Sequence, residues 1–100
     1  MSKGTFMNKN YIIVQIWLIA AGKLPLRGIA LVSLGRKAIS PEQIEKKIEA
    51  HPAFPSSGGF QSLVVSTYLP VMTTNLARTR KMLESMADAP FFEIDGTIAN

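Results

Sequence analysis

The sequence predicts a mainly α-helical protein, a small bundle of about five helices with a short C-terminal β-strand or hairpin. Several segments carry apolar residues at helical spacing together with capping residues at their ends, and only the last dozen residues alternate as a strand does. Hydrophobic residues make up 47% of the 100 residues, which is enough for one modest core. Residues 1–100 are therefore expected to form a single domain.

The first expected helix spans residues 6–21. It is a long apolar run followed by Gly22, and its length and this glycine favour a helix that ends there, although the β-branched stretch 12–16 leaves a strand open. The same run resembles a signal peptide covering 1–22; Gln15 interrupts it and argues against that alternative, which stays open. The run falls short of the roughly 18 apolar residues that a membrane span needs, so no membrane association is expected.

The second and third expected helices lie close together. Residues 24–35 form the second, which ends at a glycine followed by two basic residues. The third begins at Ser40, a favoured capping residue, with Pro41 in its first turn. Ile44 and Ile48 lie four residues apart and give this helix its apolar face, so both are expected in the core.

The second half of the chain begins with a loop. Residues 51–60 are rich in proline, serine and glycine, which predicts a surface loop or hinge. Residues 60–69 fit either a strand or a short helix, ended by the proline that follows. Residues 74–87 predict the last helix, and residues 91–96 alternate as a terminal strand does. The inward residues of the last helix are expected to be Leu76, Met82, Leu83 and Met86.

The composition limits the possible functions. Eleven Lys and Arg against seven Asp and Glu give a net charge of +4, which suits an anionic partner such as nucleic acid. No cysteine is present, so disulfides and thiolate metal sites are excluded, and a cytoplasmic location is expected. The one histidine, His51, sits at an expected helix end without a recognisable catalytic or metal-ligand spacing around it. We predict no enzymatic activity, no cofactor and no metal site.

A series of short motifs runs through the first half of the chain. These are Leu24-Pro25-Leu26-Arg27, Ile29-Ala30, Leu34-Gly35 and Ile39-Ser40, followed by Ile44 and Ile48. With the first helix they resemble the three-helix core of winged helix-turn-helix domains, over about half of the chain. In that family a glycine breaks the second helix, and a hydrophobic residue with a cap opens the third. The resemblance implies DNA binding. If the last expected helix is instead the element that reads DNA, the terminal PFFEIDGT segment is expected to act as its wing.

The expected third helix carries a net charge of −1, which suits a phosphate-lined groove poorly. The last helix is basic and is the better candidate for the DNA-reading element, although a solvated basic face is the structural alternative. The expected nucleic-acid-binding residues are Arg78, Arg80, Lys81, Asn75, Arg36 and Lys37. The sequence thus predicts a small regulatory protein of phage or plasmid type that binds double-stranded DNA.

An alternative function needs no motif and no cofactor. A small phage-type inhibitor, of which anti-CRISPR proteins are examples, binds and blocks a partner protein or a protein–nucleic-acid complex without catalysis. The expected partner-binding residues are aromatic side chains in loop positions, because large rings often anchor such interfaces. They are Phe54, Phe60 and Phe91, for which ordinary core packing is the competing interpretation.

Overall fold

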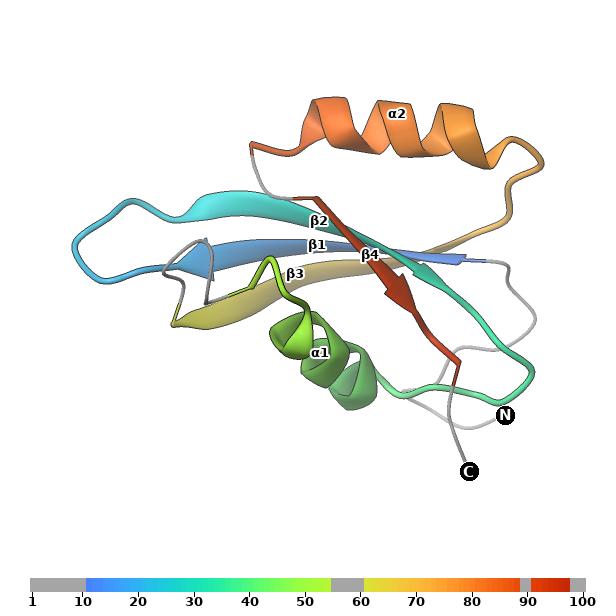
Figure 1. The fold of residues 1–100 in the computed structure, drawn as a ribbon, viewed down its shortest axis with the longest axis horizontal. Helices are drawn as coiled ribbons and strands as arrows, with labels where there is room; N and C mark the ends of the chain where they lie inside the picture. Colours follow the sequence, from blue (N-terminus) through green and yellow to red (C-terminus); the bar gives the residue numbers. More distant parts are fainter. Residues whose placement is uncertain (1–10, 55–60, 89–90, 98–100) are drawn as a thin grey trace.

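The structure, a computed structural model, describes residues 11–54, 61–88 and 91–97, and it corrects the expected fold class. This part of the chain forms a mixed α/β protein in which one helix packs on each face of a four-stranded sheet (Figure 1). The elements in chain order are β1 (Tyr11–Ile19), β2 (Leu26–Ser33), α1 (Pro41–Ala50), β3 (Ser62–Val71), α2 (Leu76–Met86) and β4 (Phe91–Asp95). The mainly α-helical bundle of about five helices is wrong, since the described residues contain two helices.

The segments expected as the first two helices are strands β1 and β2. Alternate residues of β1 point to opposite faces of the sheet. The face beneath α1 is buried along β1, whereas the face beneath α2 is buried at Ile13 and exposed at Trp17. Ile12 and Val14 pack in the core beneath α1, whereas Ile13 packs in the core beneath α2. A strand buried on both sides reads as an unbroken apolar run, which periodicity alone does not distinguish from a buried helix.

The turn between β1 and β2 contains the glycine that was expected to end a helix. The two strands pair antiparallel from Tyr11 opposite Ser33 to Leu18 opposite Leu26. Gly22 lies in the connection with a φ of 73°, a conformation that glycine adopts without steric cost. Gly22 therefore does end a secondary-structure element, but the element is a strand and the glycine lies in the turn of a β-hairpin.

The strand order in the sheet is β3-β1-β2-β4. Strand β1 runs antiparallel to both of its neighbours, while β4 runs parallel to β2, so β2, β3 and β4 all point the same way. The chain crosses from β2 to β3 through α1 and returns from β3 to β4 through α2. Because crossovers between parallel strands share one hand, two crossings in opposite directions place their helices on opposite faces.

Helix α1 has the boundaries and the buried face that its sequence predicts. Ser40 accepts a hydrogen bond from the Gln43 backbone N–H at 3.2 Å, and the Gln43 side chain accepts one from the Ser40 N–H at 2.9 Å. This reciprocal pair is a capping box. Ile44 and Ile48 are fully buried and pack against the sheet with Phe92, which confirms both as core residues.

Helix α2 lies over β2 and β4 on the opposite face of the sheet (Figure 1). Its expected position at 74–87 is confirmed, but two of its expected inward residues are wrong. Leu83 is buried against the sheet and Leu76 packs beside it, whereas Met82 and Met86 are both about half exposed. Helix α2 covers only one half of this face of the sheet, so no core lies beneath the two methionines.

The two interpretations left open for residues 60–69 are resolved by β3. Strand pairing with β1 extends from Ser62 to Val71, so Pro70 lies inside the strand and does not end it. The terminal alternation is confirmed as β4, which joins the sheet beside β2 and is not a separate wing. Of the expected loop, residues 51–54 form a turn, and 55–60 lie outside the described residues.

Candidate interaction surface

The half of the sheet that α2 leaves uncovered carries large apolar side chains. On this side Trp17 of β1 lies opposite Val64 of β3, and Leu69 lies opposite Ile13. Trp17 is 37% exposed, Val64 52% and Leu69 56%. No described element covers these three side chains. Together with Met82 and Met86 they make up a surface that we call the open face.

The two methionines join the open face because of the geometry of α2. Leu83 points into the sheet, and Arg80 forms an ion pair with Glu93 of β4. At 100° per residue, Met82 and Met86 project from the side of the helix opposite to Arg80. That side faces β1 and β3, so both methionines border the uncovered half of the sheet.

Arg27 forms a cationic border to the open face. It lies opposite Trp17 in the β1–β2 pairing, and its guanidinium carbon is 5.3 Å from the centre of a Trp17 ring. This is a cation–π contact, in which the charge is attracted to the face of the ring. The backbone carbonyl of Arg27 also accepts a hydrogen bond from the Asp88 N–H at 3.1 Å, which ties the end of α2 to β2.

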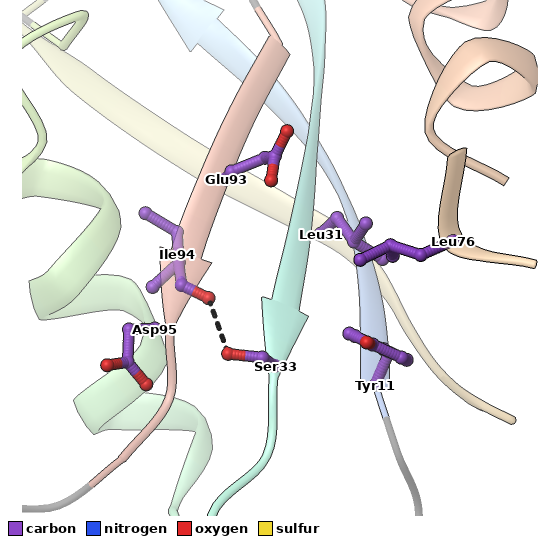
Figure 2. Close-up of a pocket in the computed structure, with 7 residues that line it drawn as sticks. All are labelled: Tyr11, Leu31, Ser33, Leu76, Glu93, Ile94 and Asp95. Atoms are coloured by element: carbon purple, nitrogen blue, oxygen red, sulfur yellow. Dashed lines mark hydrogen bonds between the residues drawn. The ribbon is translucent and has the colours of Figure 1, made fainter. Parts of the chain in front are cut away.

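A hollow of about 280 Å³ lies at the opposite end of α2 (Figure 2). It opens at the carboxyl ends of the parallel pair β2 and β4, which is where open α/β sheets commonly bind ligands. Its apolar wall comes from β1, β2 and the first residue of α2, and its polar wall comes largely from β4. The lining residues are Tyr11, Leu31, Ser33, Leu76, Glu93, Ile94 and Asp95.

Three polar side chains of this hollow, those of Glu93, Asp95 and Ser33, already have partners in the protein. Arg80 donates to the Glu93 carboxylate at 3.0 Å, and this hydrogen bond raises the pKa of the Arg80 guanidinium. The Thr97 N–H donates to the Asp95 carboxylate at 2.9 Å and lowers the pKa of that carboxyl group. The Ser33 hydroxyl donates to the Ile94 carbonyl at 3.5 Å (Figure 2). The two carboxylates of the hollow are thus engaged within the fold, Glu93 by Arg80 and Asp95 by the Thr97 backbone.

The expected nucleic-acid-binding residues fall into two groups. On α2, Arg78 and Lys81 are exposed on the side away from the sheet, while Arg80 is held by Glu93. Asn75 caps α2, its side-chain oxygen accepting the Arg78 backbone N–H at 3.0 Å. The second group lies elsewhere, exposed in the loop between β2 and α1. It consists of Arg36 and Lys37.

Of the aromatic residues expected to bind a partner, neither Phe54 nor Phe91 belongs to the open face. Phe54 is 3% exposed and belongs to the core beneath α1, so its ring is not available to a partner. Phe91 is half-buried and packs against the core beneath α2. Phe60 lies outside the described residues.

His51 ends α1 and makes contacts within the fold. Its Nδ1 accepts a hydrogen bond from the Ala53 N–H at 3.1 Å, and its ring stands edge-on to Phe92 at 5.3 Å. Across residues 11–54, 61–88 and 91–97, no three acidic or histidine side chains gather where they could hold a metal ion. Neither described helix is long and apolar enough to cross a membrane.

Comparisons with known proteins identify no relative. No family model, no curated protein and no solved structure matches this chain. The open face is therefore interpreted from its own chemistry.

Sequence reasoning missed the open face because it depends on the sheet. Trp17 lies in the apolar run that the sequence predicts as the first helix, and Met82 and Met86 are predicted on the inward side of the last helix. The sequence feature that could have predicted this surface is the alternation of side chains along a strand. Once β1 and β3 are paired, this alternation assigns Trp17 and Val64 to one face. The position of α2 on that face depends on tertiary packing, and no local sequence pattern predicts it.

Proposed function

We propose that this protein is a non-catalytic binding protein that docks on a partner protein through the open face. The observation that supports the proposal is the set of large apolar side chains that no described element covers. Exposure of large apolar side chains to water is unfavourable, and several of them on one face of a soluble protein mark an interaction site. Here Gln15 and Thr67 lie between the Trp17–Val64 pair and Leu69. A protein that masks another protein's surface in this way acts by blocking or recruiting it.

The residue types of the open face match those of protein interfaces. Tryptophan and methionine are enriched there relative to the rest of a protein surface. Methionine side chains are flexible and polarisable, so a pair such as Met82 and Met86 adapts to the shape of a partner. Trp17 offers a rigid ring on a central strand of the sheet, and tryptophan is among the residue types that contribute most binding energy at interfaces.

Charge indicates the chemistry of the partner. The protein carries a net charge of +4, and Arg27 borders the open face beside Trp17. Electrostatic complementarity at an interface guides encounter and excludes wrong partners. We therefore propose a partner surface that is apolar in its centre and acidic at its rim.

A differential capture experiment tests this proposal. The immobilised full chain and its Met82→Lys/Met86→Lys variant are exposed to the same extract, and bound proteins are quantified. The matched control is Ala77→Lys/Ser85→Lys, which adds the same two charges to exposed positions on the same helix. We expect a partner that binds the wild type and the control but not the methionine variant. Equal capture by all three proteins would refute the open face as the binding surface.

The outer face of α2 supports a second candidate, duplex DNA binding. Arg78 and Lys81 lie three residues apart, and both are exposed on the side of the helix opposite to Leu83. Two neighbouring cations suit contacts to phosphate oxygens. Because Arg80 is paired with Glu93, this surface offers fewer free charges than the sequence suggests.

A further inference from the structure

The two edges of the sheet differ in length and charge. Strand β4 at one edge has five residues and includes Glu93 and Asp95. Strand β3 at the other edge has ten residues and no charged residue at all. Proteins usually protect an exposed strand edge by keeping it short or by placing charges on it, because free backbone groups pair with other strands. Among the described strands, β4 has both of these features and β3 has neither.

The backbone groups that point outward from β3 follow from the contacts of β1. The carbonyl of Gln15 accepts a hydrogen bond from the Ser66 hydroxyl, and the carbonyl of Ile19 accepts one from the Gln61 N–H. These odd-numbered residues of β1 therefore face β3, so the even-numbered Ile16 and Leu18 face β2. Their partners on β3, Val65 and Leu63, must then turn their own N–H and C=O groups to the outer edge.

Pro70 supports this assignment. It lies opposite Ile12, another even-numbered residue of β1, so its backbone also faces outward. Proline has no N–H to donate and is tolerated inside a sheet only where that position faces away from a neighbouring strand. Among the described residues, the outward backbone groups of β3 are thus interrupted at Pro70, and a register shift makes Ser66 a bulge, while Leu63 and Val65 on either side of Val64 keep regular pairing with β1.

We propose that β3 pairs antiparallel with β3 of a second copy of this chain, about a two-fold axis that passes near Val64. In this register Leu63 of each copy exchanges two backbone hydrogen bonds with Val65 of the other, which satisfies the outward groups on both sides. The two four-stranded sheets become one continuous sheet of eight strands. A second copy fits this edge because a strand is its own antiparallel partner and no like charges oppose each other across the axis.

The side chains beside the axis add to the pairing. Val64 lies on the open face, and the two-fold axis brings both copies of this residue side by side. Val64 and Trp17 are neighbours across β1 and β3, so the apolar surfaces of the two copies become continuous. Specific interfaces bury about 1,200 Å² or more in total, which a backbone ladder achieves only with such neighbouring side chains.

Solution mass tests the dimer directly. We expect sedimentation equilibrium of the full chain to give twice the 10.9 kDa of one copy. Val64→Lys places two positive charges at the axis and should halve this mass. Met82→Lys, at a site with nearly the same exposure (54% against 52%) but away from the edge, should leave the mass unchanged. A wild type with the mass of one copy, or a Val64→Lys variant that retains the mass of two, would overturn the proposal.

A cysteine variant tests the register without introducing charge. The chain contains no cysteine, so Val64→Cys supplies one thiol per copy. Opposed residues of a non-hydrogen-bonded antiparallel pair lie about 4.5 Å apart at Cα, within the range that a disulfide bridges. Mild oxidation should therefore cross-link Val64→Cys into covalent pairs, and should leave Met82→Cys largely single. Equal cross-linking of the two variants would contradict the register. Both readouts use the purified protein alone, so they fail or succeed independently of partner capture.

Discussion

Ile48 is fully buried between α1 and the sheet, in contact with the core that also holds Ile12 and Phe92. Replacing it with alanine removes apolar contacts and leaves a cavity, since neighbouring side chains relax only in part. We expect Ile48→Ala to lower the free energy of unfolding by about 2–4 kcal/mol, measured by urea denaturation. Met82→Ala, at an exposed position, should change it by less than about 0.5 kcal/mol.

Gly96 follows β4 at a place where the chain passes very close to β2. Its N–H donates to the Ser33 carbonyl at 2.7 Å. A Cβ at this position would meet that same carbonyl oxygen and the Val32 side chain, so the backbones of the two segments would have to separate. We expect Gly96→Ala to lower the free energy of unfolding by about 1–3 kcal/mol, the usual range for overpacking. Thermal unfolding of the variant beside the wild type measures it, and an unchanged midpoint would show that this approach relaxes freely.

Tyr68 gives the protein a sensitivity to alkaline pH. Its hydroxyl donates to the Glu45 carboxylate at 2.8 Å, and burial together with this hydrogen bond raises the pKa of Tyr68 well above its ordinary value of 10.0. The unfolded chain ionises near pH 10 while the folded protein keeps its proton, so this stability is fully present below pH 10 and is lost progressively above it. We expect the free energy of unfolding to fall between pH 10 and pH 11, and to fall less in Tyr68→Phe. Parallel slopes for the two proteins would contradict this assignment.

At the scale of elements, the cap of α1 is the clearest local determinant. Ser40 satisfies the Gln43 N–H, which otherwise has no partner within the helix. We expect Ser40→Ala to lower the free energy of unfolding by about 1 kcal/mol. Ser40→Asp, which keeps an acceptor at this position, should restore most of the loss. Urea denaturation of both variants checks this, and similar losses in both would show that the capping interaction is not responsible.

The elements differ in how well the sequence predicts them, for physical reasons. Helix α1 is predictable because its cap, its first-turn proline and its apolar face are all local features. Strand β1 is not, since Ile12, Ile13 and Val14 are buried against different helices and the run lacks alternation. Helix α2 is predictable in position, but its buried side is set by Leu83 and Arg80 meeting β2 and β4. The candidate surface depends on that docking, so the sequence places Met82 and Met86 on the inward side of the helix although both are exposed.

At the scale of the whole molecule, the distribution of positive charge decides how strongly DNA binding is expected. Arg78 and Lys81 share the outer face of α2, whereas Arg36 and Lys37 lie in the loop that follows β2. If the two cations on α2 contact phosphates, the slope of log affinity against log salt should flatten by up to about 1.8 in Arg78→Gln/Lys81→Gln, at about 0.9 per contact. Mobility shifts with random duplex across a salt series measure it. An absence of salt-sensitive binding by the wild type would rule out the DNA candidate.

The connection order of the sheet also determines how the chain reaches its folded state. Strands β1 and β2 are joined by a short turn, so their pairing closes a small loop and requires little loss of chain entropy. Strands β3 and β4 arrive later in the sequence and attach to opposite sides of this hairpin, each after a helix. Pairing of strands that are far apart in the sequence slows folding, because the chain between them must close into a loop before their contacts can stabilise the structure. We therefore expect the β1–β2 hairpin to form early and the outer strands to pair with it later.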